Sequence, residues 1–566
     1  MAQGRLSVND LDLSPKPGKK YWSNGTREWR EEFIYFLMVD RFHDDHRRVP
    51  RTTRGKQKGF GTADQLHATC GGTLKGITQH LDYIKNLGCT ALWLSPVFEN
   101  NPESYHGYDI IDFTRVDPRF GTMEDLAELV DAAHQRDMRV ILDIVLHHAG
   151  NVWSYPDGYD YYYYDGAVFP FGGWRYDDKP VPGELRNPDL YWRKGQIRNF
   201  DRYPETREGD FHRLKTFRND ESPEALYVQY VMTCIHCYWI RETDIDGFRL
   251  DSVKHMPEKH ISLFCSQIRE YACKLGKRDF FLFGEIVGPD EMYDHYIGPK
   301  TSVLVGDTAI YYGLNSVLDF PLYHVLADVI LGRATPHKLI QRYESLRRSA
   351  LERGGQFGEF LVTFVDNHDQ VGQEFKKRFG FDATAEQIIA AVGFLLCALG
   401  TPCIYYGTEQ GFSGAGESDA FIRECMFSLS DETTNALNPN SRIYREIATI
   451  AEIRKQSAAL RFGRMYMRQS STDGKSFEMP ARHDCMVAFS RILFDEEMLI
   501  VYNDSTTQDD EEYICVDRQL NPPGSVFRYL YGGKGKLHVL KNEDSSHHFV
   551  KIKLRPMQFV ILTNQS

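Results

Sequence analysis

Short apolar runs alternate with longer segments of helical period through most of the chain. The first two runs, 34–42 and 91–98, enclose a helix pattern over 74–87. The next unit has a predicted helix over 123–136 and a β-branched run over 139–145, which suits a strand buried on both faces. Repeated strand-helix units of this kind predict a parallel sheet.

The alternation breaks over 150–222, where the chain is rich in Tyr, Gly, Pro and Asp and has no helical period. A stretch of this length predicts a small inserted domain rather than a loop. The alternation then resumes with helix 226–240, strand 245–251, helix 258–275, strand 280–285 and further units up to the run 402–407. About eight strands in this order favour a closed (β/α)8 TIM barrel over an open sheet.

After a last predicted helix near 441–458, short alternating segments such as MVAFSRI, MLIVYN and FVILTN predict a C-terminal all-β domain. The expected fold class is therefore α/β, a TIM barrel with an inserted domain after the third strand and a C-terminal β-sandwich. The expected parts are an N-terminal extension 1–32, a barrel 33–149 and 223–459, an inserted domain 150–222 and a β-sandwich 460–566.

The composition of this chain argues against some classes of partner. It has 566 residues, 42% hydrophobic and 26% charged, with a net charge of -12 that argues against nucleic acid as a partner. The longest apolar run, 388–400, is well short of the roughly 20 residues that cross a bilayer, so we expect no membrane contact. The N-terminus has no apolar signal core and the 11 Cys lack paired spacing, which together predict a cytoplasmic protein with reduced thiols.

Four predicted strands end in ionisable residues, and the C-terminal ends of barrel strands meet at one mouth. The four segments are DIVLHH (143–148), GFRLDSVKH (247–255), FGE (283–285) and FVDNHD (364–369). Ionised side chains are rarely buried without partners, so an acid at each of the four strand ends predicts a cleft lined by carboxylates.

These four segments resemble, in order and spacing, the signature segments of the α-amylase family of glycoside hydrolases, family 13. The segments SYHGYDIIDFTRVDPRFGT (104–122) and GTPCIYYGTEQG (400–411) add to the resemblance, which covers roughly 33–566. It implies a retaining hydrolase of α-1,4-linked glucans or maltooligosaccharides, a reaction that needs two carboxyls about 5 to 5.5 Å apart. By the resemblance, Asp251 is the nucleophile, Glu285 is the acid and base, and Asp369 stabilises the distorted sugar.

Further residues of these segments imply substrate contacts. Arg249 lies two residues before Asp251 on the same strand face, where its charge favours an ionised nucleophile. The resemblance also implies sugar contacts in the reacting subsite for His148 and His368, with Tyr108 as the platform and His106 beside it. Lys254 and His255 resemble the pair that grips a glucose on the leaving-group side.

Each of these residues also has a structural interpretation. The carboxylates pair with arginines in many proteins, the histidines and Tyr108 suit a core, and Cys234 and Cys237 suit a helix core. The aromatic stretch 153–176 either stacks sugars at outer subsites or forms the core of the inserted domain, and we favour the core. Alternatives for the function are a transglycosylase or exo-α-glucosidase with the same carboxylates and, less favoured because all three acids are present, a non-catalytic scaffold.

The chain departs from the family at two positions that usually hold a structural calcium. His147 stands where the family usually has Asn, and Lys215 where it usually has Asp. A lysine cannot ligate a hard cation, so we expect this calcium to be missing, with the Lys215 ammonium near its place. No cofactor is required by the expected reaction, and the one expected partner is an α-glucan or oligosaccharide. Linkage, chain length and oligomeric state stay open.

Overall fold

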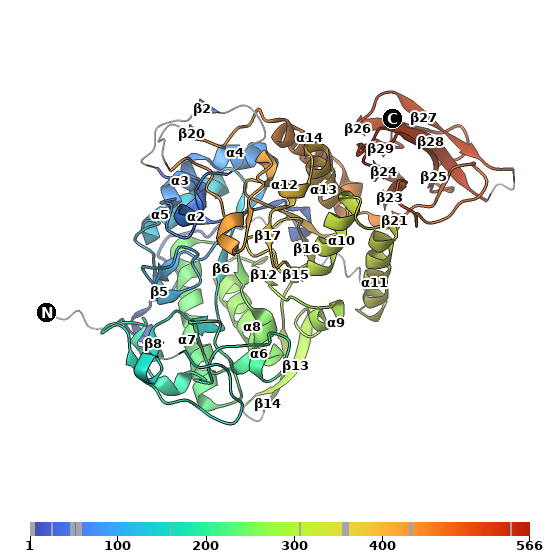
Figure 1. The fold of residues 1–566 in the computed structure, drawn as a ribbon. Helices are drawn as coiled ribbons and strands as arrows, with labels where there is room; N and C mark the ends of the chain where they lie inside the picture. The colour runs from blue at the N-terminus through green and yellow to red at the C-terminus, as the bar shows by residue number, and fades with distance from the viewer. Residues whose placement is uncertain are drawn as a thin grey trace.

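Eight parallel strands close into a barrel in the order β1, β18, β16, β15, β12, β11, β6 and β3, which confirms the predicted fold class (Figure 1). Their bounds are β1 Ile34–Leu37, β3 Ala91–Leu94, β6 Arg139–Ile144, β11 Gly247–Leu250, β12 Phe281–Gly284, β15 Ser316–Leu318, β16 Leu361–Thr363 and β18 Thr401–Tyr405. This computed structural model describes residues 6–23, 26–45, 51–52, 59–158, 160–304, 307–353, 361–429, 434–543 and 546–565.

Helices surround the barrel and follow the sequence pattern closely (Figure 1). In α5, the residues Leu126, Leu129, Val130 and Ala133 are buried at helical spacing, and the capping box of Thr122 fixes where the helix begins. The main barrel helices are α3 Leu74–Gln79, α4 Leu81–Asn86, α5 Met123–Gln135, α7 Pro223–Thr243, α8 Glu258–Lys274, α10 Phe320–Ile330, α11 His337–Arg353, α13 Ala385–Cys397 and α14 Arg442–Gln456. The shorter ones are α1 Val39–Phe42, α2 Ala63–Leu66, α6 Glu205–Glu208, α9 Asp290–Tyr293, α12 Phe379–Asp382 and α15 Ala458–Phe462.

The strand register brings the predicted acids to one end of the barrel. Every residue of β6 is buried, and β11 pairs in parallel with β6 on one side and with β12 on the other. Arg249 of β11 therefore lies level with Asp143 of β6 and Phe283 of β12. The residues that follow β11 and β12, Asp251 and Glu285, emerge at the same mouth.

The inserted segment between β6 and α7 contains short strands and one short helix, α6, in keeping with the lack of a helical period in its sequence. They are β7 His148–Ala149, β8 Trp153–Ser154, β9 Gly173–Trp174 and β10 Lys215–Thr216. Trp153, Tyr155 and Tyr191 are fully or almost fully buried. The core interpretation of the aromatic stretch is confirmed for Trp153 and Tyr155.

The C-terminal part is an antiparallel sheet in the order β21, β23, β24, β29, β26, β27, β28, β25 and β22 (red in Figure 1). The sheet wraps around its own core of aliphatic residues, which includes Leu499, Ile514 and Val550. Its strands are β21 Arg464–Met467, β22 Ser470–Ser471, β23 Met486–Leu493, β24 Glu496–Asn503, β25 Asp510–Val516, β26 Val526–Tyr531, β27 Lys536–Lys541, β28 His548–Leu554 and β29 Phe559–Thr563.

Two features of the structure were not expected from the sequence. An antiparallel hairpin, β13 Pro299–Leu304 and β14 Asp307–Tyr312, lies between β12 and β15. Cys70 and Cys425, 355 positions apart, form a disulfide, so the expectation of reduced thiols is wrong for this pair. The cytoplasmic location stays a prediction. Within the described part of the chain, every helix is too short or too polar to cross a membrane.

Candidate active site

One buried guanidinium connects three carboxylates at the barrel mouth. Arg249 donates from Nη1 to Asp251 Oδ1 at 2.8 Å and to Asp143 Oδ1 at 3.0 Å, and its Nη2 lies 2.9 Å from Glu285 Oε2. The Arg249 and Asp143 side chains are fully buried, whereas those of Asp251 and Glu285 are 11% and 12% exposed. The structure therefore brings Asp251 and Glu285 to one shared cation, with a small part of each side chain exposed.

The two open carboxylates have opposite electrostatic environments. Burial by itself raises the pKa of Asp251, but the positive charge of Arg249, together with His148 and the Ser252 hydroxyl, lowers that pKa below its ordinary value. Burial and the negative charges of Asp251 and Asp369 raise the pKa of Glu285 to about 8, despite Arg249. At neutral pH the pair thus consists of one carboxylate and one carboxylic acid.

Ser252 contributes to this difference. Its backbone is left-handed, with φ of 55°. The Ser252 hydroxyl donates to Asp251 Oδ2 at 2.5 Å, while its backbone N–H donates to Glu285 Oε2 at 3.3 Å. The stronger bond goes to the acid that stays ionised.

Asp143 is the acid of the first of the four strand-end segments, but no individual role in the site was predicted for it. It accepts hydrogen bonds from Trp93 Nε1 at 3.1 Å and from the Tyr108 hydroxyl at 3.0 Å, besides its bonds to Arg249. Burial and the charge of Asp251 raise the pKa of Asp143 to about 7, although Arg249 opposes the change. The signal was available, because Asp143 interrupts an otherwise apolar strand beside the arginine strand.

Asp369 enters the mouth from the loop after β16 and faces His368 and Arg423. His368 Nε2 lies 3.2 Å from Asp369 Oδ2 and 2.9 Å from the Tyr108 hydroxyl. Arg423 donates to Asp369 Oδ1 at 2.5 Å and to the His368 carbonyl at 2.8 Å. Burial alone would raise the pKa of Asp369, but His368 and Arg423 lower it, so this acid stays ionised. Arg423 was not expected from the sequence, where it is one of two adjacent charged residues, with Glu424, in the segment IRECMF (422–427).

The predicted histidines lie around this centre, and two of them have a ring nitrogen without a hydrogen-bond partner in the described structure. His148 lies on β7, and burial lowers its pKa to about 4; its Nε2 has no hydrogen-bond partner in the described structure. Burial likewise lowers the pKa of His368 to about 4, and its Nδ1 is without a partner there. The His106 ring stacks beside Tyr108 with centroids 5.8 Å apart. Both unpartnered ring nitrogens belong to neutral imidazoles, which donate to or accept from sugar hydroxyls.

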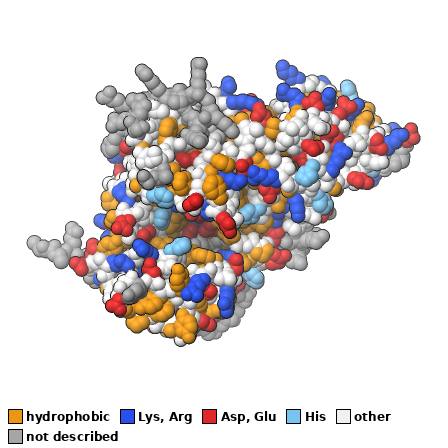
Figure 2. Space-filling view, in the orientation of Figure 1, with side chains coloured by type: hydrophobic (Ala, Val, Ile, Leu, Met, Phe, Trp, Pro, Cys, Tyr) orange, Lys and Arg blue, Asp and Glu red, His pale blue; other side chains and the backbone are white. Residues whose placement is uncertain are grey.

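Lys254 and His255 follow Asp251 closely in the chain and contact the inserted domain. The Lys254 ammonium pairs with Asp201, and His255 Nδ1 lies 3.0 Å from the Thr206 hydroxyl. The His255 ring also packs against Phe211 at 4.5 Å between centroids. One segment of the inserted domain thus positions both members of the predicted pair. The face of the molecule shown in Figure 2 is hollowed near its centre, where acidic side chains and histidines gather.

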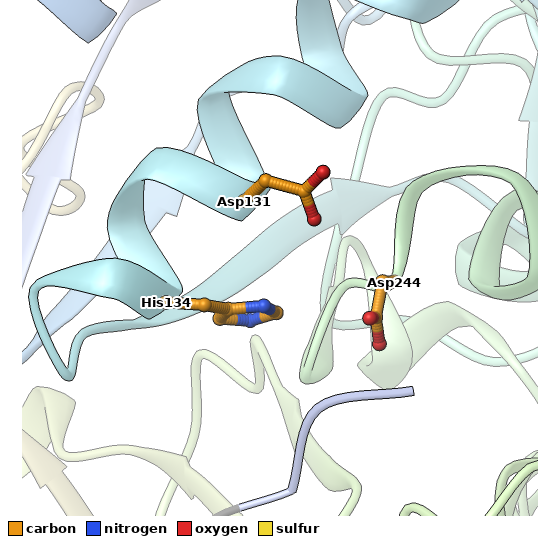
Figure 3. Close-up of side chains that lie close together, drawn as sticks. All are labelled: Asp131, His134 and Asp244. Carbon is orange, nitrogen blue, oxygen red and sulfur yellow. The ribbon is translucent and has the colours of Figure 1, made fainter. Parts of the chain in front are cut away.

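A group of possible metal ligands lies at the opposite end of the barrel. Ligand atoms of Asp131, His134 and Asp244 fall within 4.8 Å of one another (Figure 3). Asp244, however, accepts a 2.6 Å bond from Lys277, and His134 Nε2 lies 2.8 Å from Asp246. The ammonium group already compensates the Asp244 charge and repels a further cation, so this group is an ion-pair network beneath the barrel.

His147 and Lys215, where the resemblance implied a structural calcium, are residues that do not fit a calcium ion. Lys215 is 2% exposed, with Nζ 3.9 Å from Asp210 Oδ2 and 4.8 Å from the centroid of the Trp153 ring. His147 is fully buried, and burial lowers its pKa well below the ordinary value. An ammonium beside Asp210 repels a dication, and an imidazole is a poor ligand for a hard one.

Comparison with known proteins agrees with this geometry. A model of the α-amylase catalytic domain matches residues 36–443. The chain belongs to the α-amylase family. It is 30% identical to an α-amylase of Streptomyces lividans over 89% of this chain, and 26% identical to a cyclomaltodextrin glucanotransferase of Klebsiella oxytoca over 81% of this chain and 70% of that protein. The solved α-amylase of Geobacillus thermoleovorans in complex with acarbose superposes with a TM-score of 0.69 at 26% identity, over 95% of this chain and 99% of that one.

This α-amylase-family chain matches only part of the length of the first curated relatives. It spans 58% of the length of the Streptomyces lividans protein and 33% of the β/α-amylase of Paenibacillus polymyxa, to which it is 30% identical. The relatives include both amylases and glucanotransferases. The relatives therefore do not decide between hydrolysis and transfer, which depends on the residues of this chain's own site.

Proposed function

We propose that this chain is a retaining α-glucosidic enzyme that hydrolyses α-1,4-linked glucans or maltooligosaccharides. The observation that carries the proposal is the pair Asp251 and Glu285, held by one guanidinium and opposite in protonation at neutral pH. Retention needs carboxyls about 5 to 5.5 Å apart, and inversion needs roughly 6.5 to 9.5 Å. Two carboxylates bound to neighbouring nitrogens of one arginine favour the closer spacing.

The roles follow from the protonation states. The Asp251 carboxylate attacks the anomeric carbon, while the Glu285 carboxylic acid protonates the leaving oxygen, so that the glycosidic bond breaks as the Asp251 ester forms. In the second step Glu285, now ionised, takes a proton from water, which attacks the anomeric carbon, and the bond from that carbon to Asp251 breaks to release the Asp251 carboxylate. Asp369 remains ionised beside His368 and Arg423, where its charge stabilises the oxocarbenium-like sugar.

The substrate class rests on the leaving-group side of the site. Lys254 and His255 present an ammonium and an imidazole next to Asp251, which suits a hydroxyl-rich leaving group. A leaving glucose of an α-1,4 chain has that chemistry. Transfer to a sugar acceptor is the second candidate, supported by the similarity to cyclomaltodextrin glucanotransferases.

The test is product analysis with maltoheptaose and, separately, with sucrose. Proton NMR in the first minutes of the maltoheptaose reaction should show the α-anomer of the new reducing end, and β-anomer as the first product would refute retention. Shorter oligosaccharides alone indicate hydrolysis, whereas chains longer than the substrate indicate transfer. The variant Asp251→Asn should be inactive, while Glu103→Gln, at an exposed glutamate near Tyr108, serves as the matched carboxyl-to-amide control.

We also propose that the chain works without calcium at the position of His147 and Lys215. The Lys215 ammonium supplies the positive charge next to Asp210 that a bound cation would otherwise supply. Tyr155 and the backbone N–H of Thr216 complete the Asp210 environment, with bonds of 2.8 and 3.0 Å. The carboxylate is thus satisfied by groups of the chain itself.

A further inference from the structure

The turn that carries Asp369 has an unusual backbone conformation. Gln370, the next residue, has φ of 42°, in the left-handed region that residues other than glycine rarely adopt. Gln370 is also almost fully buried. A backbone in such a conformation persists only where the groups around it fix it. The contacts of this turn therefore decide where the Asp369 carboxylate points.

Asn367 and the Gln370 side chain hold one side of the turn. The Asn367 side-chain oxygen accepts from the N–H groups of Asp369 at 2.7 Å and of Gln370 at 2.8 Å. The Gln370 side-chain amide accepts from the Tyr323 hydroxyl and donates to Asp366 Oδ1. These contacts satisfy the N–H side of the turn and leave the Asp369 carbonyl to a different donor.

Lys376 supplies that donor. It begins the short strand β17 Lys376–Lys377 (Figure 1), and its ammonium donates to the Asp369 carbonyl at 2.6 Å and to the Gln370 carbonyl at 3.4 Å. The Gln370 carbonyl also accepts from the Gln373 N–H at 3.3 Å. The shorter of the two Lys376 bonds thus goes to the backbone of the acid itself.

The same ammonium connects the turn to a second loop. Lys376 Nζ lies 3.1 Å from Asp419 Oδ1, and Asp419 Oδ2 lies 3.7 Å from Arg423 Nη2. The pairing of Lys376 with Gly416, in β19 Ala415–Gly416, keeps the two loops adjacent. Arg423 binds the Asp369 carboxylate and Lys376 binds the Asp369 backbone, so cations fix both parts of this residue.

We propose that Lys376 is a positioning residue for Asp369, which it fixes through the carbonyl side of the left-handed turn. The inference rests on the proposed function for the role of Asp369 beside the oxocarbenium-like sugar. That charge develops mainly in the transition state, so a displaced Asp369 loses an interaction that the bound substrate does not make. Loss of Lys376 therefore lowers kcat and leaves KM almost unchanged.

The first measurement is steady-state kinetics of the full chain on maltoheptaose. Lys376→Met removes the ammonium, and kcat should fall about tenfold or more while KM stays within about twofold. Lys376→Arg keeps a cation with several N–H donors and should restore kcat to within about threefold of wild type. The matched control is Lys377→Met, at the neighbouring lysine of β17, whose ammonium pairs with Asp382 at 2.6 Å. This control should keep kcat within about twofold.

A second substrate separates an effect on Asp369 from an effect on Glu285. In α-maltosyl fluoride the leaving fluoride needs no proton, so the acid function of Glu285 is not required. If Lys376 acts through Asp369, Lys376→Met should lose the same factor in kcat/KM on this fluoride as on maltoheptaose. A loss confined to maltoheptaose would overturn the inference, because Lys376 would then act through the acid.

Binding tests the inference without turnover. The probe is acarbose, the ligand of the solved Geobacillus thermoleovorans enzyme, whose protonated amine carries a positive charge like that of the oxocarbenium-like sugar. By calorimetry, Lys376→Met should raise the Kd of acarbose about tenfold, with a fitted stoichiometry near one that shows the variant is folded. The Kd of maltoheptaose, measured in the inactive Asp251→Asn background, should change less than about twofold.

Unchanged kcat and unchanged acarbose affinity in Lys376→Met would overturn the positioning role, and so would an equal loss in Lys377→Met. A chain whose acarbose affinity depends on Lys376 but that cleaves no α-glucoside would refute the proposed function and leave the positioning role standing. A chain that cleaves maltoheptaose equally well with and without Lys376 would do the opposite, and one that neither binds acarbose nor cleaves maltoheptaose would refute both.

Discussion

Replacing Glu285 by Gln should stabilise the protein in a way that grows with pH. Glu285 has a pKa of about 8 in the folded chain against an ordinary value of 4.5, mainly because it is buried. Between these two values the folded state keeps a proton that the unfolded state has released, so stability falls as pH rises from about 4.5 to 8. Glutamine does not titrate, so the variant does not lose this part of its stability as the pH rises.

The size of the effect follows from the pKa difference. A shift of roughly 3.5 pKa units at about 1.36 kcal/mol per unit corresponds to about 5 kcal/mol of lost stability in the wild type above pH 8. An unfolding entropy of about 2.1 cal/mol/K per residue gives roughly 1.2 kcal/mol/K for a chain of this length, so the loss equals about 4 °C in melting temperature. The amide for carboxyl exchange has a further effect that is independent of pH.

The assay is the melting temperature of both proteins at pH 5 and pH 9. Because pH 5 already lies above 4.5, the difference between Glu285→Gln and wild type should increase by about 3 °C from the lower to the higher pH, with any constant offset cancelled. In the Glu103→Gln control, an exposed carboxylate outside the Arg249 network is removed, and the difference from wild type should stay the same at both pH values. An equally constant difference for Glu285→Gln would refute the raised pKa and with it the account of Glu285 as a neutral acid.

Other predictions concern activity and the cation of the inserted domain. Initial rates of Asp251→Asn on maltoheptaose should fall at least about 10³-fold, because the attacking carboxylate is gone. Arg423→Gln should lower kcat/KM about 10 to 100-fold, since it removes a charge-assisted bond to Asp369 of about 1.5 to 3 kcal/mol, and Arg423→Lys should retain part of it. Chelation by EDTA should leave activity and melting temperature unchanged, and a marked fall in either would contradict the calcium proposal. Lys215→Met should cost about 3 kcal/mol in urea unfolding, because Asp210 keeps its burial and loses its cation.

The fold was predictable because its units are local. Strands such as β3 are buried on both faces and read as continuous apolar runs, and helices such as α5 carry their buried stripe and cap in the sequence. A barrel then places every strand end at one mouth, so Asp251 and Glu285 were expected to meet without knowledge of any distance. The hairpin of β13 and β14 does not interrupt the alternation of strands and helices in the sequence, so it was not predicted.

The remaining parts of the site depend on contacts between loops. Arg423 reaches Asp369 from a loop 54 positions later, and Cys70 bonds to Cys425 across 355 positions. Such pairings leave no periodic pattern in the sequence, because the conformation of a loop depends on the rest of the folded structure. Asp143 lies on a predicted strand, but its role appears only once the parallel register puts it beside Arg249.

Arg249 explains why the two acids differ although they share one partner. Its single positive charge faces Asp143, Asp251 and Glu285, and one cation cannot neutralise three buried carboxylates. Asp251 gains the Ser252 hydroxyl in addition, whereas Glu285 receives only the longer bond from the Ser252 backbone. Glu285, which receives the longer hydrogen bond, is the carboxyl that keeps its proton. A second cation in contact with Glu285 would ionise it and remove the acid, so the shortage of positive charge at this mouth is what the proposed chemistry requires.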